Sequence, residues 1–459
     1  MPQRNLVIIT LSALISLACY YKAERNRDAV VIAEAMHTIE QNYFEEIDRR
    51  ELFEGAMNGM VGKLDEHSAY FPPRKYTSLQ EQLDQEFGGV GIVVELNQQT
   101  KRLTVLSPVV NTPAYHAGMR AGDTILKIEG KSTEGMSLDD AVGLMRGPEG
   151  EPVELVVRHT GEEDLVTFKI EREIIRTPSV LGDRHDDRGA WQFTLEDHPN
   201  IAHVRLTTFG EHTAEELQEA LEFKGRRVDG LIFDVRGNAG GYLKTAIEVS
   251  RIFISDGAIV STRGRGGVMQ SEYLANSTAK FDTKTPMVVL TDRFSASASE
   301  IVAACLQDHG RAIVIGERTW GKGTVQNIIR MEGGKSALKL TTASYWRPSG
   351  KNIHRGKNAD EDDDWGVQPN DGFEIKLTDD QLREVARLRR ERDLYNIGGS
   401  KNNRADDDEP AVEPVDNGDR NETETDDSSE ADDEVFVDPQ LQKAIEYLEK
   451  QIASRREKA

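Results

Sequence analysis

The sequence predicts a multidomain protein that combines an α/β domain with a smaller β-rich domain. The chain has 459 residues, enough for two or three separate cores. Between residues 173 and 375, apolar strands alternate with helices, which is typical of an α/β layer with functional loops at the strand ends. Between residues 85 and 172, short alternating apolar runs are separated by glycines, which indicates β-strands.

The β-rich region also predicts one helix. Ser137 precedes an apolar helical run and Asp140 lies three positions further on, a capping-box pattern that starts a helix. Apolar residues of this helix are Ala141, Val142 and Met145. The expected strands of the region are Ile92 to Leu96, Leu103 to Leu106, Thr124 to Ile128 and Val153 to Arg158.

In the α/β region, apolar strands alternate with helices. Before it, residues 29–84 carry apolar side chains at helical spacing, which predicts a helical N-terminal segment. After it, a further helix is expected within residues 376–400. The α/β elements expected are strand Gly230 to Val235 with helix Tyr242 to Phe253, strand Met287 to Thr291 with helix Ala298 to His309, and strand Ala312 to Ile315.

Residues 1–28 have the pattern of an export signal or membrane anchor. Arg4 precedes the apolar stretch Leu6 to Tyr21, and a charged segment follows. We therefore expect an extracytoplasmic protein, periplasmic or in the cell envelope, that is either anchored in the membrane or secreted. The residues before Cys19 loosely resemble a lipoprotein cleavage site, so lipidation of Cys19 and an uncleaved anchor with an incidental cysteine both stay open.

The C-terminal part changes in character twice. Residues 401–436 consist largely of Asp and Glu with Ser, Thr, Asn and Pro, and such a segment cannot bury enough apolar surface to fold, which predicts a disordered acidic linker. In residues 437–459, Asp438 as N-cap and Pro439 as first helical residue open an amphipathic helix.

Composition excludes several classes of function. The formal net charge of −23 and the pI near 5.0 argue against nucleic acid as a partner, because that affinity depends on Lys and Arg neutralising phosphates. Cys19 and Cys305 are the two cysteines, so the folded part has no disulfide framework. No histidines show a metal-ligand spacing such as H-E-x-x-H, so we expect neither a metal nor another cofactor.

A serine is presented at the start of a predicted helix. The segment Ser295 to Glu300 lies between an apolar strand and an apolar helix, with Ser297 between two small alanines. Free amides and the positive end of the helix dipole favour the negative charge of an acyl-transfer transition state there. The alternative is an ordinary Ser-capped helix.

The loop Gly316 to Gln326 contains a single lysine, Lys322, between Gly321 and Gly323 and beside Trp320. A lysine can serve as the base for a serine hydroxyl if burial lowers its pKa, and the glycines permit tight enclosure. If Lys322 to Gln326 were a strand, both side chains would share one face and Gln326 could orient the amine. A phosphate-binding loop is disfavoured because Gly323 occupies its Ser/Thr position. A surface lysine without a role is the other alternative.

A third element is the glycine-rich loop from Asp234 to Gly241, after a buried strand. Consecutive glycines before a helix let main-chain N–H groups point at a ligand. An amide of Gly240 or Gly241 could therefore pair with that of Ala298 as an oxyanion hole. A simple strand-to-helix turn is an equal alternative.

Taken in order, these motifs resemble the C-terminal processing peptidases, also called tail-specific proteases. The resemblance covers about residues 29–371. It implies Ser297 as nucleophile, Lys322 as general base and Gln326 as the residue that orients it, and the spacing of Ser297 and Lys322 matches the family. The motifs are Met57 to Met60, Leu64 to Ser68, Phe87 to Ile92, Ala117 to Asp123, the Asp234 loop, the Ser297 segment, Thr341 to Tyr345 and Pro348 to Gly350.

The resemblance also implies a fold and a substrate class. Residues 85–172 would form a PDZ domain, a β-sandwich or partly open barrel with helices, that binds protein or peptide C-termini, and residues 173–375 a crotonase-like ββα protease domain. In a PDZ domain, a Gly-rich turn holds the terminal carboxylate and the next strand pairs with the peptide. Arg146 resembles a residue that links peptide occupancy to protease alignment. The peptide-binding residues implied are Gly88, Gly89, Val90, Gly91, Ile92, Val93 and Arg146.

Two departures from the family pattern concern the rim of the substrate cleft. The usual Pro-Asp appears as Pro369-Asn370, and the acidic insert Asp360 to Asp364 precedes it. We expect a serine endopeptidase that uses a Ser/Lys acyl-enzyme mechanism. The alternative is a catalytically inert PDZ-containing scaffold, and the sequence leaves open whether the chain forms a homodimer.

Overall fold

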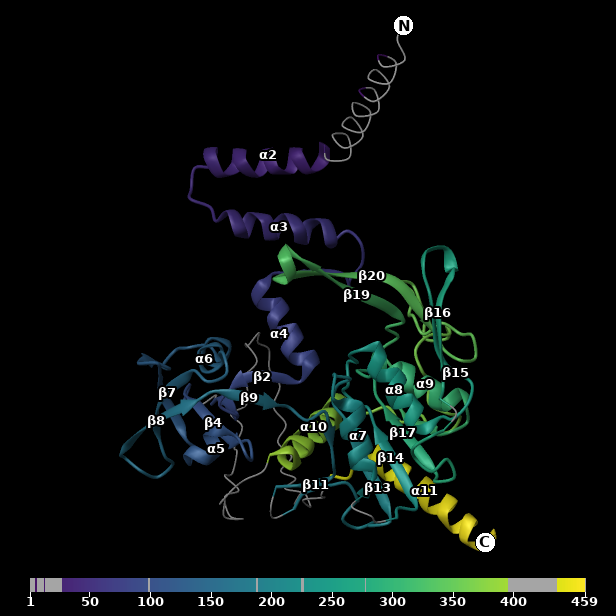
Figure 1. The fold of residues 1–459 in the computed structure, drawn as a ribbon. Coiled ribbons are helices and arrows are strands. Elements are labelled where there is room, and N and C mark those ends of the chain that lie inside the picture. The colour runs from purple at the N-terminus through teal and green to yellow at the C-terminus, as the bar shows by residue number, and fades with distance from the viewer. Residues whose placement is uncertain are drawn as a thin grey trace, which may run out of the picture. The chain divides into compact units, whose positions relative to one another are not determined.

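The computed structural model describes residues 27–97, 100–186, 189–223, 227–276, 278–394 and 436–458, together with Asn5 and Ser12. It divides into two units, residues 1–78 with 325–343 and residues 79–324 with 344–459 (Figure 1). Almost all of the predicted export segment, including Cys19, and of the predicted acidic linker lies outside the described residues. Within the described part, no helix has the length and apolar character needed to cross a membrane.

The first unit consists of N-terminal helices and a strand that pairs with residues 337–339, near the end of the α/β region. Strand β1 (Ala69–Phe71) pairs antiparallel with β20 (Ser336–Trp346), so that Tyr70 lies opposite Leu338. Asp48 caps α3 by accepting a hydrogen bond from the Arg50 amide at 2.7 Å. The helices are α2 (Arg27–Asn42), α3 (Arg49–Val61) and the start of α4 (Pro73–Asp84), and β19 (Thr324–Met331) and η3 (Glu332–Gly334) precede β20.

The second unit begins with a small antiparallel domain. Its sheet has the order β3-β4-β5-β7-β8, with β6 paired to β5, so β3 lies at an edge. The side chain of Ser137 caps α6 by accepting from the Asp140 amide, as the sequence predicts. Strands β2 and β9 form a separate two-stranded antiparallel sheet. The elements are β2 (Glu86–Gly89), β3 (Ile92–Leu96), β4 (Leu103–Pro108), α5 (Pro113–Ala117), β5 (Thr124–Ile128), β6 (Lys131–Ser132), α6 (Leu138–Met145), β7 (Pro152–Arg158), β8 (Leu165–Glu171) and β9 (Glu173–Arg176).

The remainder of the second unit is built on a mainly parallel sheet. Strands β13, β14, β17 and β18 run parallel, and β10 adds an antiparallel edge. The three strands β13, β14 and β17 are buried throughout, as expected of a sheet covered on both faces. The elements are β10 (Val180–Leu181), β11 (Arg184–His185), β12 (Trp191–Gln192), β13 (Ile201–Leu206), α7 (Thr213–Leu221), β14 (Gly230–Asp234), α8 (Leu243–Phe253), β15 (Ala258–Arg263), η2 (Arg265–Gly267), β16 (Met269–Leu274), β17 (Met287–Thr291), α9 (Ala298–Asp308), β18 (Ile313–Gly316), α10 (Asp379–Asp393) and α11 (Pro439–Lys458).

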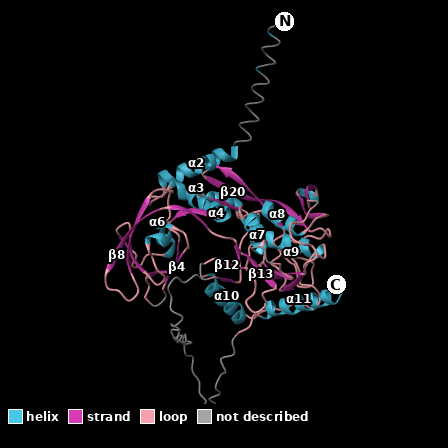
Figure 2. Cartoon of the chain, turned by 60° about the horizontal axis from the view of Figure 1, so that its bottom comes forward, coloured by secondary structure: helices cyan, strands magenta, loops and turns pink. Residues whose placement is uncertain are grey.

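Different helices cover the two faces of this sheet (Figure 2). Because side chains alternate along a strand, Ile232 and Phe233 of β14 face opposite ways. Ile232 packs in one core cluster with Ala444 and Leu448 of α11. Phe233 contacts the ring of Phe253 in α8, with ring centroids 5.5 Å apart. The C-terminal helix is therefore part of the core of this α/β domain and covers one face of its sheet.

Candidate active site

Ser297 lies at the junction between β17 and α9, where the chain turns from the sheet into the helix. It directly precedes the first helical residue, Ala298, and has φ 57° and ψ −111°. A positive φ is rare for a residue with a side chain and indicates a strained turn that the surroundings enforce. The residue is 7% exposed. The fold thus holds this hydroxyl at the carboxyl edge of the parallel sheet, where α/β proteins place ligand sites.

Glu300, one turn into α9, joins the serine to the lysine loop. Its side chain is fully buried. Oε2 accepts hydrogen bonds from the amides of Ser297 at 2.7 Å and of Lys322 at 2.8 Å. Oε1 accepts from the Gly321 amide at 2.7 Å and from the Thr319 hydroxyl at 2.6 Å. One carboxyl oxygen therefore fixes the backbones of Ser297 and Lys322 against each other.

The environment of Glu300 also determines its ionisation. Burial raises the pKa of Glu300 to about 7, against the lowering effect of its hydrogen-bond donors. Sequence analysis missed this residue, although the Ser297-to-Glu300 spacing has the form of a capping box. That pattern predicts the bond to the Ser297 amide, but not the bonds to the loop of Lys322.

The lysine loop is packed tightly on its two glycines. A Cβ atom at Gly323 would lie 2.1 Å from the His354 nitrogen, and one at Gly321 would lie 2.7 Å from Cβ of Arg355. The Arg355 amide donates to the Gly321 oxygen at 2.8 Å. Residues 354 and 355 thus pack against both chain neighbours of Lys322, Gly321 and Gly323. Lys322 itself is half-buried and lies two residues before β19, which begins at Thr324, so only residues 324–326 of the segment Lys322 to Gln326 belong to a strand.

Tyr345 brings a second hydroxyl to the serine. Its side chain hydrogen-bonds the Ser297 side chain, and burial raises the pKa of Tyr345 above its ordinary value. The Tyr345 amide donates to the Gly323 oxygen at 2.7 Å, which ties it to the lysine loop. Sequence analysis did not single out this tyrosine, since its bonds link segments far apart in the chain.

The glycine loop after β14 lies directly against the nucleophile. A Cβ atom at Gly240 would come within 2.9 Å of the Ser297 Cβ and 3.0 Å of the Ala298 nitrogen, so a residue with a side chain cannot be accommodated. The Gly240 amide, however, donates to Asn238 Oδ1 at 2.8 Å. This hydrogen bond favours Gly241 over Gly240 among the two oxyanion donors that the sequence offers. At Gly240 the missing side chain allows the loop to approach Ser297 closely.

Gly241 and Ala298 are the two remaining candidates for oxyanion donors. The Phe209 amide donates a hydrogen bond to the Gly240 oxygen, and the Phe209 oxygen accepts one from the Tyr242 amide. Gly241 lies between these two bonded residues, so its own amide points away from Phe209. Ala298 is the first residue of α9, where amide groups have no partner within the helix.

Asn238 links this loop to the serine segment. Its backbone carbonyl oxygen accepts hydrogen bonds from the Ala296 amide at 3.0 Å and from the Ser299 hydroxyl at 2.9 Å. Its side-chain amide donates to the Leu206 oxygen at 2.8 Å. The sequence placed Asn238 in a candidate loop without giving it a role, and the structure shows that it connects that loop to both sides of Ser297.

Gln326, the residue expected to orient the lysine, belongs to the first unit. Its amide donates to the Thr341 hydroxyl at 3.3 Å, and that hydroxyl donates to Asp65 Oδ1 at 3.2 Å. Ser68 completes this network with a hydrogen bond from its hydroxyl to Asp65 Oδ2 at 2.9 Å. The motifs around Asp65 and Thr341, far apart in sequence, thus meet at Gln326.

The residues expected to bind peptide lie on β2, on β3 and in the turn between them. Gly91 has φ 77°, and a Cβ atom there would lie 2.2 Å from Thr112. Gly88 and Gly89 pair with β9, and Ile92 and Val93 belong to the edge strand β3. The Val90 side chain is buried in the domain core.

Arg146 follows the last residue of α6. Its guanidinium pairs with Glu81 at 2.6 Å and lies over the Phe87 ring, 4.1 Å from the centroid.

Asn370 stands where the family pattern has an aspartate. Its side-chain oxygen accepts a hydrogen bond from the Val314 amide at 2.7 Å and so anchors the edge strand β18. Over the described part of the chain, no three His, Cys, Asp or Glu side chains are arranged to hold a metal ion.

Comparison with known proteins identifies both domains. Residues 200–370 match the model of peptidase family S41, and residues 104–159 match the PDZ domain. Residues 19–72 match the N-terminal domain of the activating protease CtpB. The fold and the site therefore define a PDZ-containing serine peptidase.

Relatives place the chain more closely. It is 40% identical to a carboxy-terminal-processing protease of Bartonella bacilliformis, over 67% of this chain and 68% of that protein. It is 33% identical to the carboxy-terminal processing protease CtpB of Bacillus subtilis, over 72% of this chain and 67% of that protein. Among solved structures, the photosystem II D1 C-terminal processing protease is 27% identical with a TM-score of 0.41, covering 78% of this chain and 96% of that one. The chain belongs to the carboxy-terminal processing proteases of family S41 and is a serine-type endopeptidase.

Proposed function

We propose that this endopeptidase works through an acyl-enzyme formed on Ser297 with Lys322 as general base. The observation that carries this proposal is that one oxygen of the Glu300 carboxyl group accepts hydrogen bonds from the amides of both Ser297 and Lys322. A serine needs a base within reach, and a neutral amine beside it supplies one. Membership of a serine peptidase family supports the same assignment. No feature of the described residues favours the alternative of an inert scaffold.

The reaction proceeds in two halves. Lys322 accepts the proton of the Ser297 hydroxyl, and the oxygen attacks the scissile carbonyl carbon. The amides of Gly241 and Ala298 stabilise the resulting oxyanion. The carbon–nitrogen bond breaks, and the amine leaves with the proton from Lys322. Water then attacks the acyl group and gives a proton to Lys322. The ester bond breaks, and Lys322 returns that proton to the Ser297 oxygen, which restores both the hydroxyl and the neutral amine. Gln326 orients the lysine amine without adding a charge.

Replacing Glu300 by glutamine tests the linkage between the two loops. An amide has one acceptor oxygen, so its NH₂ group must face either the Ser297 and Lys322 amides or the Gly321 amide and Thr319. We expect kcat to fall about 100-fold, because small displacements of reacting groups have effects of that size. The measurement is steady-state cleavage of an unstructured peptide with an apolar C-terminus. Unchanged kcat in the folded variant would rule out a positioning role.

The difference in unfolding free energy between wild type and the same variant is expected to depend on pH. The pKa of Glu300 is raised from 4.5 to about 7 in the folded protein. The stabilisation that its protonated form provides is thus complete below pH 4.5 and is lost as pH rises to about 7. The unfolding free energy of wild type relative to Glu300→Gln should therefore fall by about 3 kcal/mol over this window. Urea unfolding at several pH values measures it, and a constant difference contradicts the assignment.

For substrate recognition, we propose that the turn at Gly91 holds a C-terminal carboxylate while β3 pairs with the peptide. Two features support this: the left-handed turn with its buried glycine and the edge position of β3. The contacts of Arg146 with Glu81 and Phe87 then connect the end of α6 to α4 and β2. A ligand that displaced Arg146 from these partners would change that connection, which is the switch that the sequence suggested.

Amidating the peptide C-terminus is expected to weaken its binding to the full-length Ser297→Ala variant at least about 10-fold, because a charge-assisted hydrogen-bond set is lost. Gly91→Ala should weaken the free-acid peptide similarly. Gly135→Ala is the matched control, since Gly135 has a similar φ of 74° but open space around it. Equal affinity for acid and amide, measured by fluorescence anisotropy, would count against carboxylate recognition.

Three further proposals rest on sequence pattern. Residues 1–28 export the chain and attach it to the membrane on the extracytoplasmic side, which fractionation with and without these residues tests. Residues 401–436 form a solvated acidic spacer. The protease domain has a crotonase-like ββα arrangement, and the helices on both faces of its sheet support this.

A further inference from the structure

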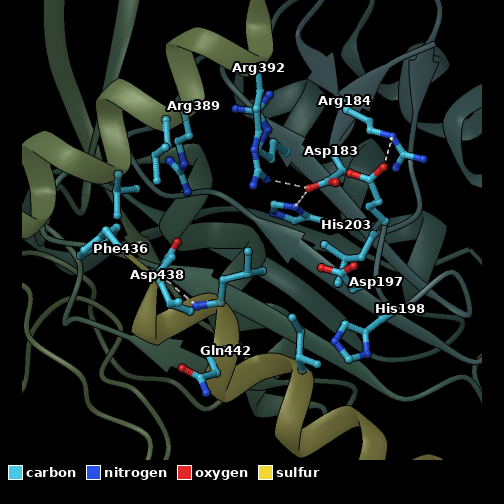
Figure 3. A pocket seen from close by; sticks show the side chains of 18 of the residues that line it. Asp183, Arg184, Asp197, His198, His203, Arg389, Arg392, Phe436, Asp438 and Gln442 are labelled. Atoms are coloured by element: carbon cyan, nitrogen blue, oxygen red, sulfur yellow. Dashed lines mark hydrogen bonds and ion pairs between the residues drawn. The ribbon is translucent and has the colours of Figure 1, made fainter. Parts of the chain in front are cut away.

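The two C-terminal helices reach the loop that lines the active site, although the matched peptidase model ends at residue 370. Helices α10 and α11 border a pocket of about 730 Å³ next to β13. Figure 3 shows Arg389 and Arg392 of α10 and Asp438, which directly precedes α11, projecting into it. Arg392 pairs with Asp183 at 3.0 Å. These helices therefore bring charged groups to the carboxyl edge of the sheet.

The convergence centres on Arg236, two residues after β14. Its guanidinium is buried and pairs with Asp234 at 2.8 Å and with Asp438 at 2.8 Å. Gln440 Oε1 accepts a further hydrogen bond from Arg236 at 2.9 Å. Burial alone would raise the pKa of Asp234, but the charges of Arg236 and Arg389 hold it well below its ordinary value. Asp234 thus stays ionised, and Asp438 supplies a second negative charge to Arg236.

Arg236 begins the loop that faces the nucleophile. The next residue, Gly237, donates its amide to Asp292 at 2.9 Å, and Asn238 then bonds to both sides of Ser297. Gly240 follows, and a Cβ atom there would lie 2.9 Å from the Ser297 Cβ, so the loop lies close to the nucleophile. A shift of Arg236 would therefore move the loop that carries Gly241.

Asp438 has two functions at once. Its side chain accepts from the amides of Gln440 at 3.1 Å and Leu441 at 3.2 Å, which caps α11. The same carboxylate binds Arg236 through both oxygens, at 3.1 and 2.8 Å. The start of the C-terminal helix and the start of the active-site loop are thus fixed by one group.

We propose that Asp438 is a positioning residue for catalysis: by holding Arg236, the C-terminal helix sets the Gly237-to-Gly241 loop against Ser297. This rests on the proposed oxyanion role of Gly241. A loop that stabilises charge in the transition state affects kcat and leaves ground-state binding unchanged.

Asp438→Asn tests this with little change in shape. Asparagine remains a good N-cap, so the substitution removes the charge opposite Arg236 and keeps the helix start. In the full-length protein we expect kcat for the unstructured peptide to fall about 10- to 100-fold with KM within about 2-fold. Gln440→Leu removes the other acceptor of α11 for Arg236 and should lower kcat about 3- to 10-fold.

Leu448→Ala is the control for loss of stability alone. Leu448 is a fully buried residue of the same helix and contacts the sheet away from Arg236. Assayed below its thermal transition, this variant should keep kcat within about 2-fold of wild type. The proposal is overturned if Leu448→Ala loses as much kcat as Asp438→Asn, or if Asp438→Asn and Gln440→Leu both keep wild-type kcat. Retained turnover by Ser297→Ala would instead refute the nucleophile assignment, so the two failures are distinguishable.

Discussion

Replacing Ser297 by alanine is expected to lower kcat for peptide hydrolysis by on the order of 10⁴-fold or more, because the acyl-enzyme cannot form. The remaining groups, including the Gly241 and Ala298 amides, would still bind the substrate, so KM should change little. The strained turn at φ 57° holds this hydroxyl beside Tyr345 and the lysine loop, and no neighbouring serine has that position. Steady-state kinetics on the purified full-length chain measures both constants.

Ser295→Ala provides the matched control. Ser295 lies two residues away and is also buried, but its hydroxyl bonds to the Val235 oxygen at 2.9 Å and so has a structural role. We expect this variant to lose stability, by about 1 to 3 kcal/mol, and to retain turnover at a temperature where it is folded. If Ser295→Ala were inactive and Ser297→Ala active, the nucleophile would have been misidentified.

The second large effect is expected at Lys322. Lys322→Ala should lower kcat by about 10²- to 10⁴-fold, the usual contribution of a general base. Lys322→Arg should be similarly inactive, because a guanidinium keeps its proton at any accessible pH and cannot accept that of Ser297. The arginine variant thus separates proton transfer from a purely electrostatic role.

Lys351→Ala serves as the control for removing a positive charge near this region. Lys351 is an exposed residue paired with Asp364 at 2.8 Å, and exposed pairs contribute little. Its loss should leave kcat within about 2-fold. Wild-type turnover by Lys322→Arg would exclude lysine as the base and leave a charge requirement in its place.

The elements that present Ser297 could be predicted because local pattern determines them. The strand Met287–Thr291 and the start of α9 at Ala298 are confirmed as predicted, since an unbroken apolar run followed by small residues and an apolar helical repeat has one simple interpretation. Family motifs then identified Ser297 and Lys322 as residues to examine. Local pattern alone left an ordinary helix cap for Ser297 and a surface lysine for Lys322 as alternatives, and the ordered family motifs favoured the catalytic interpretation.

What the sequence could not supply are the contacts that join separate segments. Glu300 was read as part of a helix start, yet three of its four partners come from the lysine loop, and only the tertiary fold brings that loop to it. Gly240 and Gly241 were equivalent in sequence. The Asn238 side chain distinguishes them by occupying the Gly240 amide.

The C-terminal region shows the same limit. Asp438 and Pro439 gave a helix start at the right place, because capping is local. That the same carboxylate also binds Arg236, about two hundred positions earlier, has no local signal. The strand from Lys322 to Gln326 was considered only as a condition in the sequence, and in the structure Gly323 is packed against His354 and β19 begins at Thr324.

Acid-quenched mass spectrometry of the enzyme mixed with an activated peptide ester would measure the covalent intermediate itself. An acyl group from the N-terminal side of the ester should be attached to the fragment that contains Ser297. The adduct should be absent from Ser297→Ala and should form far more slowly on Lys322→Arg. Rapid ester turnover by wild type with no adduct on that fragment, or with the adduct on another residue, would contradict catalysis by Ser297 and Lys322.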